Sequence, residues 1–229
     1  MQQDLFLQQD EGLCGYNRSN SPNFDAVKIQ VSRDAVIFKA ALKSIAPHIL
    51  QGIERISGAN PFRHRTTPGG QRMSASMTNC GSFGWITDTS GYRYSDAEPE
   101  TGLPWPTMPA DWYCWANQFS DLAGFGVLNP DACLINRYAS GTGMGLHQDR
   151  DEKDLSAPIV SFSLGAPVLF RWGGFNRQES VCEFLLEHGD VLVWGGADRM
   201  RFHGVKKLQR YQHPLTGSYR YNLTFRRSQ

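Results

Sequence analysis

The chain has 229 residues, 40% of them hydrophobic, which is enough to bury the core of one large domain and too few for two domains of equal size. Its 23 basic and 22 acidic residues give a formal charge of +1, so any contact with nucleic acid needs a local basic patch. Five scattered cysteines without C-x-x-C spacing argue against a zinc ribbon or a disulfide framework and indicate free thiols. With no apolar run of membrane-spanning length and a Gln-rich start unlike a signal peptide, we expect a cytoplasmic protein without membrane contact.

The first half of the sequence predicts an N-terminal arm followed by one long helix. Residues 1–27 are polar with little periodicity, which favours a loosely held, flexible arm. From Asp34, a candidate N-cap, apolar residues recur every three or four positions as far as Ile56. This spacing predicts an amphipathic helix, which Pro47 should kink or split.

Residues 58–108 predict hairpins and exposed loops, and a second helix follows them. The segment is rich in Gly, Pro, Ser, Thr and Tyr in short alternating pieces, which suits hairpins and exposed loops. So irregular a segment inside a compact domain is often functional. Trp112, Trp115 and Phe119 then predict a helix that begins after Pro109 and packs its aromatic stripe into the core.

After Pro130 the texture changes to short apolar runs separated by Gly, Pro and Asn. The runs cover residues 132–138, 157–164, 167–172, 181–186, 189–194 and 219–226. Such spacing predicts an antiparallel jelly roll or barrel. The expected fold class is therefore α+β, mainly β: one domain over residues 28–229, with a jelly-roll core over about 130–227 and supporting helices.

His147, Asp149 and His203 form a candidate metal site. On a strand, residues i and i+2 face the same way, so His147 and Asp149 can converge on one ion, joined by His203 from a later strand. Two imidazoles and one carboxylate are the set that binds Fe(II) with open positions. The alternatives are a hydrogen-bonded core histidine, a turn carboxylate and a surface histidine, or a zinc hydrolase, which would have no need of the arginines described next.

The C-terminal strand carries a polar face. Period-two alternation places Arg220, Asn222, Thr224 and Arg226 on one side. Two guanidiniums facing inward require anionic partners, and a bound dicarboxylate would supply them. The alternative is a half-exposed strand whose polar face lies in water.

Four motifs together resemble the AlkB family of Fe(II)- and 2-oxoglutarate-dependent nucleic-acid demethylases. They are Asn136-Arg137-Tyr138, His147-Gln148-Asp149, His203 and Arg220-x-Asn222-x-Thr224-x-Arg226. The resemblance extends from about Pro61 to Arg227 and implies a double-stranded β-helix core.

The resemblance also implies the cofactors and the residues that hold them. The enzyme would use Fe(II), 2-oxoglutarate and O2, with His147, Asp149 and His203 as metal ligands. Arg220, helped by Tyr138, would bind the distal carboxylate of 2-oxoglutarate, and Asn136, Asn222 and Arg226 would complete the pocket.

The implied activity is oxidative demethylation of bases such as 1-methyladenine and 3-methylcytosine in DNA, with RNA left open, releasing formaldehyde, succinate and CO2. The base would be single-stranded or flipped and would stack on an aromatic side chain. By resemblance, residues 58–108 form a substrate-binding lid that includes Thr67, Met77 and Tyr92. Trp85 would stack on the base, and Asp151 would recognise it. Candidate phosphate contacts are Arg63, His64, Arg65, Arg72, Arg177, Arg199 and Arg201.

Two other functions remain open at this point. One is an oxygenase with the same core that acts on RNA alone, on protein or on a small molecule. The other is a non-catalytic module that recognises modified bases, although such a module has no need of an open iron site. We expect a monomer.

Overall fold

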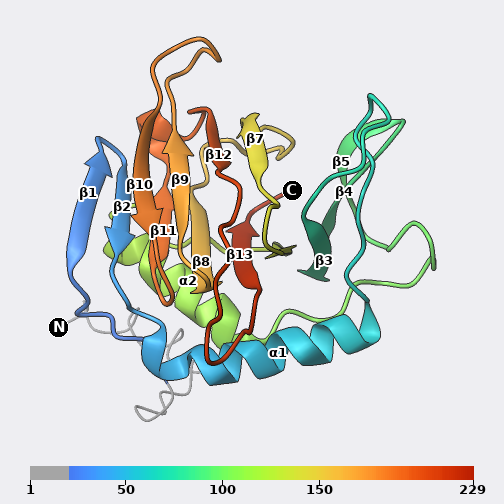
Figure 1. Ribbon diagram of the computed structural model, residues 1–229, viewed down its shortest axis with the longest axis horizontal. Helices are drawn as coiled ribbons and strands as arrows, with labels where there is room; N and C mark the ends of the chain where they lie inside the picture. The colour runs from blue at the N-terminus through green and yellow to red at the C-terminus, as the bar shows by residue number, and fades with distance from the viewer. Residues whose placement is uncertain (1–20) are drawn as a thin grey trace, which may run out of the picture.

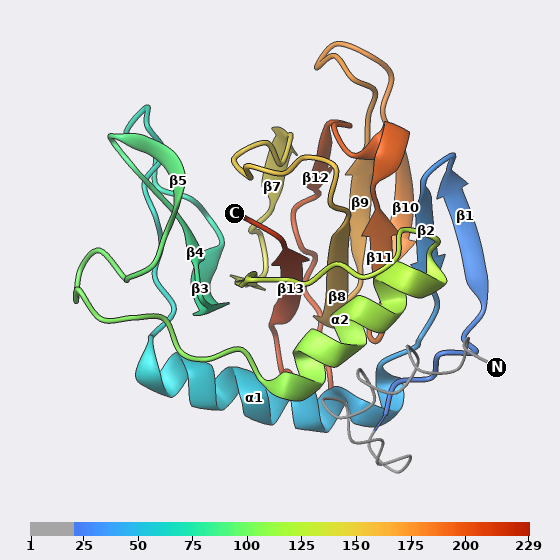
Figure 2. The same ribbon diagram turned by 180° about the vertical axis from the view of Figure 1, so that it is seen from behind.

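The computed structural model describes residues 21–229, which form two packed β-sheets, a separate hairpin and two α-helices (Figures 1 and 2). The seven-stranded sheet contains, in spatial order, β1 (Lys28–Ser32), β2 (Ala35–Phe38), β11 (Val191–Trp194), β8 (Ile159–Gly165), β13 (Arg220–Arg226), β6 (Ala132–Tyr138) and β3 (Ser76–Gly81). The four-stranded sheet contains β10 (Cys182–Leu186), β9 (Val168–Trp172), β12 (His203–Val205) and β7 (Met144–His147). Strands β4 (Gly84–Asp88) and β5 (Gly91–Ser95) form the hairpin.

The two larger sheets enclose an apolar core, as the predicted jelly roll requires. Phe170 and Trp172 of the four-stranded sheet lie in one buried cluster with Leu192 and Trp194 of the seven-stranded sheet. Each of the six strands predicted after Pro130 is present within two residues of its predicted ends. His147 and His203 lie on the short strands β7 and β12, in agreement with the strands expected to carry them, although no apolar run in the sequence marked either strand.

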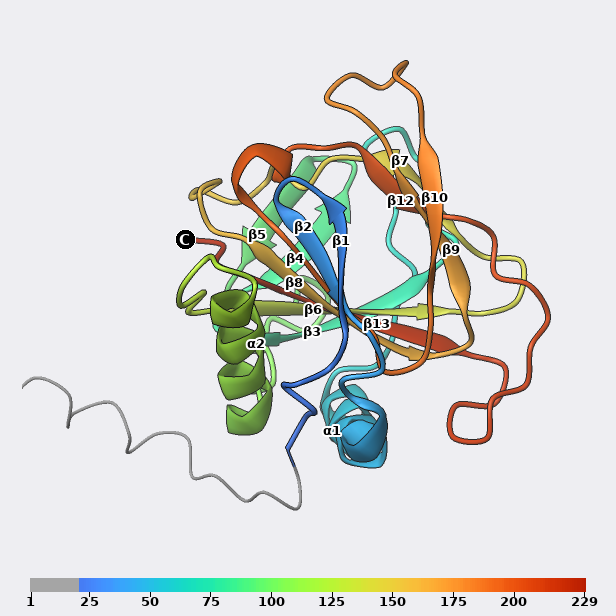
Figure 3. The same ribbon diagram turned by 90° about the vertical axis from the view of Figure 1, so that its left-hand side faces the viewer.

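Helices α1 (Ala46–Ala59) and α2 (Ala110–Leu122) pack on the outer face of the seven-stranded sheet (Figure 3). Trp112 of α2 meets Phe225 edge to face at 6.5 Å between ring centroids, and Phe119 meets Phe162 at 5.9 Å. The predicted aromatic stripe of the second helix is therefore buried in the core, and the predicted start after Pro109 is confirmed. None of the described helices has the length and apolarity needed to cross a bilayer.

The first helix is shorter than the sequence predicted, because its first third is a strand. Residues 35–38 form β2, fully buried between β1 and β11, and the α-helix begins at Ala46. Asp34 is not its N-cap, since its carboxylate accepts a hydrogen bond from the Ala197 amide at 2.7 Å. Pro47 lies in the first turn, where its missing N–H costs nothing, and so marks the start of the helix rather than a kink.

The described part of the predicted N-terminal arm, residues 21–27, contacts the core. The Asn23 amide donates to the Ala41 carbonyl at 2.7 Å, and Phe24 lies 5.1 Å from Phe119 between ring centroids. The rest of the predicted arm lies outside the described residues. The expectation of free thiols holds for Cys80, Cys133 and Cys182 and is wrong for Cys114, which is disulfide-bonded.

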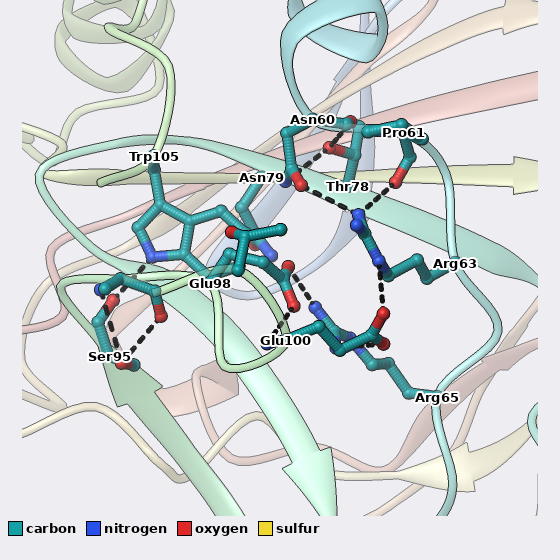
Figure 4. Close-up of polar contacts among 12 residues, drawn as sticks. Asn60, Pro61, Arg63, Arg65, Thr78, Asn79, Ser95, Glu98, Glu100 and Trp105 are labelled. Atoms are coloured by element: carbon teal, nitrogen blue, oxygen red, sulfur yellow. Dashed lines mark hydrogen bonds and ion pairs between the residues drawn. The ribbon is translucent and has the colours of Figure 1, made fainter. Parts of the chain in front are cut away.

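The predicted lid segment contains β3 and the β4–β5 hairpin, joined by loops that a buried ion pair holds together (Figure 4). Arg65 donates to Glu98 at 2.5 Å, and the two side chains are 8% and 2% exposed. The Trp105 indole donates to the Ser95 carbonyl at 2.7 Å and so attaches the end of β5 to the loop before α2. These contacts give the irregular segment a defined shape beside the core.

Two glycines of α1 test the packing of this helix on the core. A Cβ at Gly52 would lie 2.5 Å from the Trp112 indole, whereas a Cβ at Gly58 would meet nothing within 4 Å. Gly52→Ala should therefore lower the free energy of unfolding by about 1–3 kcal/mol through overpacking. Gly58→Ala should raise it by up to about 1 kcal/mol through helix propensity. Urea unfolding measures both, and stabilisation by Gly52→Ala would contradict the tight contact.

Candidate metal centre and cosubstrate pocket

Strands β7 and β12 place the two predicted histidines face to face. His147 and His203 are direct cross-strand partners, and their ring centroids lie 4.5 Å apart. Nε2 of His147 lies 3.7 Å from Oδ1 of Asp149, and Nε2 of His203 lies 3.7 Å from Oδ2. One candidate ligand atom from each residue lies within 4.8 Å of the other two, so all three can reach one ion.

Asp149 reaches this point by a route that differs from the prediction. Strand β7 ends at His147, so the alternation of a strand does not orient the carboxylate. Arg226 holds it instead, donating from Nη2 to Oδ2 at 2.7 Å, while Arg199 donates to the backbone carbonyl of Asp149 at 2.6 Å. The convergence was predicted correctly, and its cause is a pair of arginines.

Both imidazoles have the tautomer that a metal requires. Nδ1 of His147 lies 2.9 Å from the Gly145 carbonyl, and Nδ1 of His203 lies 3.0 Å from the Arg201 carbonyl. Because a carbonyl accepts only, each Nδ1 carries hydrogen and donates, which leaves the Nε2 lone pair free in the neutral ring. Both Nε2 atoms face Asp149.

The electrostatics keep the ligand set in its metal-binding charge state. Burial opposes ionisation of Asp149, but Arg226 and the two histidines outweigh it and hold the pKa of the carboxyl well below its usual range. Burial and the neighbouring His203 lower the pKa of His147 to about 4. At neutral pH the centre therefore presents a carboxylate and a neutral His147, which suits a divalent cation.

Arg220, at the other end of β13, has no ion-pair partner among the described residues. Its side chain is 2% exposed, and its described partners are the Ala166 carbonyl at 3.0 Å, the Leu186 carbonyl at 3.5 Å and the Ser163 hydroxyl at 2.7 Å. Its Nε atom is buried and has no hydrogen-bond partner. A buried guanidinium with neutral partners is costly, so this end of the strand fits a carboxylate ligand.

The other predicted cosubstrate residues lie beside Arg220 on the same face of the sheet. Tyr138 is opposite Arg220 in the register of β6 and β13, and Asn136 is opposite Asn222. Asn136 Oδ1 is buried without a partner, which adds a second unsatisfied polar atom to the pocket. Asn222 donates to the Ser161 hydroxyl at 2.7 Å and so links β13 to β8.

The hairpin brings the three predicted base-contacting residues together. Trp85 and Tyr92 stack, with ring centroids 5.7 Å apart and an interplanar angle of 19°. The Trp85 indole donates to Asp151 Oδ2 at 2.8 Å. Burial raises the pKa of Asp151, and the indole donor opposes this shift. A flat aromatic surface and a carboxylate therefore lie next to each other, two residues beyond Asp149.

The remaining predicted substrate residues are more dispersed. Met77 is buried in β3 directly opposite Asn136, so it lines the floor beside the cosubstrate pocket. Thr67 lies in a tight turn with Gln71, where its amide donates to the Gln71 carbonyl at 2.8 Å. Arg177 is exposed in the β9–β10 loop, with its guanidinium 6.0 Å from the centroid of the Phe202 ring.

Two candidate phosphate contacts are buried instead. Arg65 pairs with Glu98, and Arg199 is 3% exposed and pairs with Glu152 at 3.0 Å. The sequence also missed Glu152 and Tyr94, because an acidic run around Asp149 resembles a solvated turn. Their partners are distant in sequence, and no local pattern could have indicated them.

The comparisons with known proteins agree with this geometry. Residues 34–226 match the model of the 2OG-Fe(II) oxygenase superfamily, a range that includes the metal cluster and all of β13. The alpha-ketoglutarate-dependent dioxygenase AlkB of Escherichia coli is 48% identical over 194 residues, which cover 85% of this chain and 90% of that protein. The protein of the same name from Salmonella typhimurium is 47% identical with the same coverage.

A solved structure extends the similarity to the fold. The structure of OsALKBH1 superposes with a TM-score of 0.78 at 29% sequence identity, covering 88% of this chain and 100% of that chain. This chain and OsALKBH1 therefore share the same overall fold.

The lowered pKa of His147 has a measurable consequence. An unperturbed histidine gains a proton near pH 6.5, whereas His147 should remain neutral until the pH approaches about 4. The ring NMR signals of His147 in the metal-free protein, assigned with a His147→Gln variant, should therefore stay nearly constant from about pH 7.5 to about pH 5.5. Circular dichroism at each pH controls for unfolding. A titration midpoint of the His147 ring near pH 6.5 would contradict the shift.

Proposed function

We propose that this chain removes N-alkyl groups from bases such as 1-methyladenine and 3-methylcytosine in DNA. The premise is its family, since the chain belongs to the AlkB group of the 2OG-Fe(II) oxygenase superfamily. Membership makes the chain an Fe(II)- and 2-oxoglutarate-dependent dioxygenase that uses O2. The single observation that carries the substrate class is the stacked pair of Trp85 and Tyr92 beside the Asp151 carboxylate. A flat, cationic base fits a site with these two properties.

The site assignments are part of the proposal. His147, Asp149 and His203 hold the metal, since their ligand atoms converge and their tautomers fit. Arg220 binds the distal carboxylate of 2-oxoglutarate, supported by its unpaired Nε and by the neighbouring Tyr138. Asn136, Asn222 and Arg226 line the same strand face. When bound, iron and 2-oxoglutarate supply the O2-dependent oxidation of the methyl group that releases formaldehyde, succinate and CO2.

The remaining roles of the chain's own residues are orientation and selection. Trp85 and Tyr92 offer a stacking surface that holds an extruded base in one plane. Asp151, oriented by the indole, favours a base that carries positive charge and disfavours the neutral unmodified base. Met77 closes the floor and helps to exclude water. Thr67 is assigned to the substrate-binding lid. Arg177 is assigned to the phosphates of the DNA backbone, whose binding needs cations but little geometry.

The enzyme prefers single-stranded DNA or flipped bases as substrates, because a base within a duplex cannot reach Trp85. It acts as a monomer in the cytoplasm, and its catalytic domain covers residues 28–229 with residues 58–108 as the substrate lid. RNA is the alternative polymer, and a protein or small-molecule substrate would leave the aromatic pair without a role.

A direct assay tests the proposal. Purified protein is incubated with Fe(II), 2-oxoglutarate, ascorbate and a single-stranded oligonucleotide that contains 1-methyladenine or 3-methylcytosine, in matched DNA and RNA forms. Formaldehyde and restored base are expected with DNA. Succinate without base repair would redirect the substrate to protein or a small molecule, and absence of both products would overturn the proposal.

Two substitutions should separate metal binding from base binding. Asp149→Ala removes the carboxylate ligand and should abolish turnover while leaving oligonucleotide affinity largely intact. Trp85→Ala removes a stacking surface worth roughly 1–3 kcal/mol, so it should weaken oligonucleotide binding by about 5- to 150-fold while cobalt(II) affinity stays near that of the unmodified protein. Fluorescence anisotropy and cobalt titration measure the two properties. Equal effects of both variants on both readouts would refute the assigned roles.

A third substitution tests the cosubstrate pocket. Arg220→Ala should weaken 2-oxoglutarate binding by at least about tenfold, because a charge-assisted hydrogen bond contributes about 1.5–3 kcal/mol. Arg220→Lys keeps the charge but loses the planar fork, and an intermediate loss is expected. Calorimetry on the manganese(II)-loaded protein gives the affinities. Arg93→Ala, which removes an exposed arginine paired with Asp88, is the control. Unchanged affinity in Arg220→Ala would exclude it as the anchor.

A further inference from the structure

Glu152 is a buried carboxylate outside the metal-ligand set. Its side chain is 2% exposed, and three side chains from distant parts of the chain surround it. Arg199 donates to Oε2 at 3.0 Å, the Tyr94 hydroxyl donates to Oε1 at 2.6 Å, and Arg226 Nε lies 3.2 Å from Oε1. A carboxylate with this many partners is held in one orientation and in turn fixes the groups around it.

Both arginines that touch Glu152 also touch Asp149, at different atoms. Arg226 donates to the side-chain oxygen Oδ2 at 2.7 Å, and Arg199 donates to the backbone carbonyl at 2.6 Å. Backbone and side chain of the carboxylate ligand are therefore fixed separately, and both contacts lead to Glu152. This matters because Asp149 lies beyond the end of β7, where no strand ladder orients it.

The third partner of Glu152 connects this network to the hairpin. Tyr94 lies in β5 directly opposite Trp85 of β4, and the Trp85 indole donates to Asp151 at 2.8 Å. The hairpin is thus hydrogen-bonded to the segment after Asp149 at two points, through Tyr94 and through Trp85. Movement of the stacking surface therefore either shifts Glu152 through Tyr94 or breaks the hydrogen bond between Tyr94 and Glu152.

We propose that Glu152 is a positioning residue that orients Asp149 through Arg226 and Arg199. In the same proposal, the hydrogen bond from Tyr94 to Glu152 couples the position of the β4–β5 hairpin to the metal centre. Groups that orient metal ligands through hydrogen bonds commonly change metal affinity by about 10- to 100-fold when they are removed. The coupling to base binding rests on the proposed function, whereas the effect on the metal does not.

The charges of the network distinguish this role from ordinary core packing. Two carboxylates, Asp149 and Glu152, face two guanidiniums, Arg199 and Arg226, and all four side chains are at most 10% exposed. Without the Glu152 charge, Arg199 would keep only its carbonyl partners, and Asp149 would be the one described carboxylate left beside Arg226. Arg226 would then draw more strongly on the Asp149 carboxylate, and the electron density available to a metal from that carboxylate would fall. Substitution of Glu152 should therefore act on metal affinity even in a well-folded protein.

The first test compares two buried glutamates. Glu98 is also 2% exposed and paired with an arginine, but its partner Arg65 lies in the lid loops and makes no described contact with Asp149 (Figure 4). Glu152→Gln should lower cobalt(II) affinity of the metal-free protein by about 10- to 100-fold, and Glu98→Gln should change it less than about twofold. Thermal unfolding of both variants identifies molecules that fail to fold. Equal cobalt affinities in the two folded variants would overturn the role of Glu152.

The second test uses a milder substitution in case Glu152→Gln does not fold. Tyr94→Phe removes one hydroxyl. Tyr113→Phe is its control, because Tyr113 lies in α2 and its hydroxyl donates to the exposed Asn129 at 2.8 Å. The probe is a single-stranded 3-methylcytosine oligonucleotide added to the cobalt(II) protein. In the unmodified protein and in Tyr113→Phe it should change the cobalt absorption spectrum, and in Tyr94→Phe it should bind with little spectral change.

The outcomes separate this inference from the proposed function. If the oligonucleotide fails to bind the unmodified protein, the proposed substrate is wrong, and the Glu152 comparison still decides the positioning role. If it binds and Tyr94→Phe shows the full spectral change, the coupling through Tyr94 is refuted. A spectral change that is lost in Tyr94→Phe with affinity retained supports it.

Discussion

The contact between Arg226 and Asp149 is the interaction on which the centre depends. The Asp149 carboxylate is buried beside two imidazoles, where burial favours the neutral acid. Arg226, 2.7 Å away, reverses this preference and keeps a charged metal ligand in place before any metal arrives. Because Arg226 belongs to β13, the position of the ligand is set by the central part of the seven-stranded sheet rather than by the loop that carries Asp149.

The two ends of β13 then differ in a way that follows from their partners. Arg226 has carboxylates from the chain itself, whereas Arg220 has a hydroxyl and two carbonyls. The strand spans roughly 20 Å between these residues at about 3.3 Å per residue, with Asn222 and Thr224 between them. The polar face between them suits an anion whose one carboxylate pairs with Arg220, which has only neutral partners in the described chain, and whose other end points toward the metal centre.

The sequence revealed those parts of the site that have a local pattern. Period-two alternation identified the polar face of β13, and the His147-x-Asp149 spacing identified the ligands, although Asp149 is oriented by arginines instead of by strand geometry. The helical spacing predicted α1 correctly from Ile49 to Ile56 and was wrong at its start, because Phe38 of the buried strand β2 lies in step with the apolar face of the helix. Glu152 stayed hidden, since its contacts with Tyr94 and Arg199 cross 58 and 47 residues of sequence.

Charge balance explains why metal and cosubstrate suit the same cavity. Among the described residues, Asp149 and Glu152 balance the charges of Arg226 and Arg199, and Arg220 has no carboxylate at ion-pair distance. A divalent cation alone would add two positive charges beside these guanidiniums, and a dicarboxylate alone would leave the Asp149 side of the cavity more negative. Bound together they add no net charge. Each therefore lowers the electrostatic cost of the other, so the buried arginines favour a cavity that fills with both.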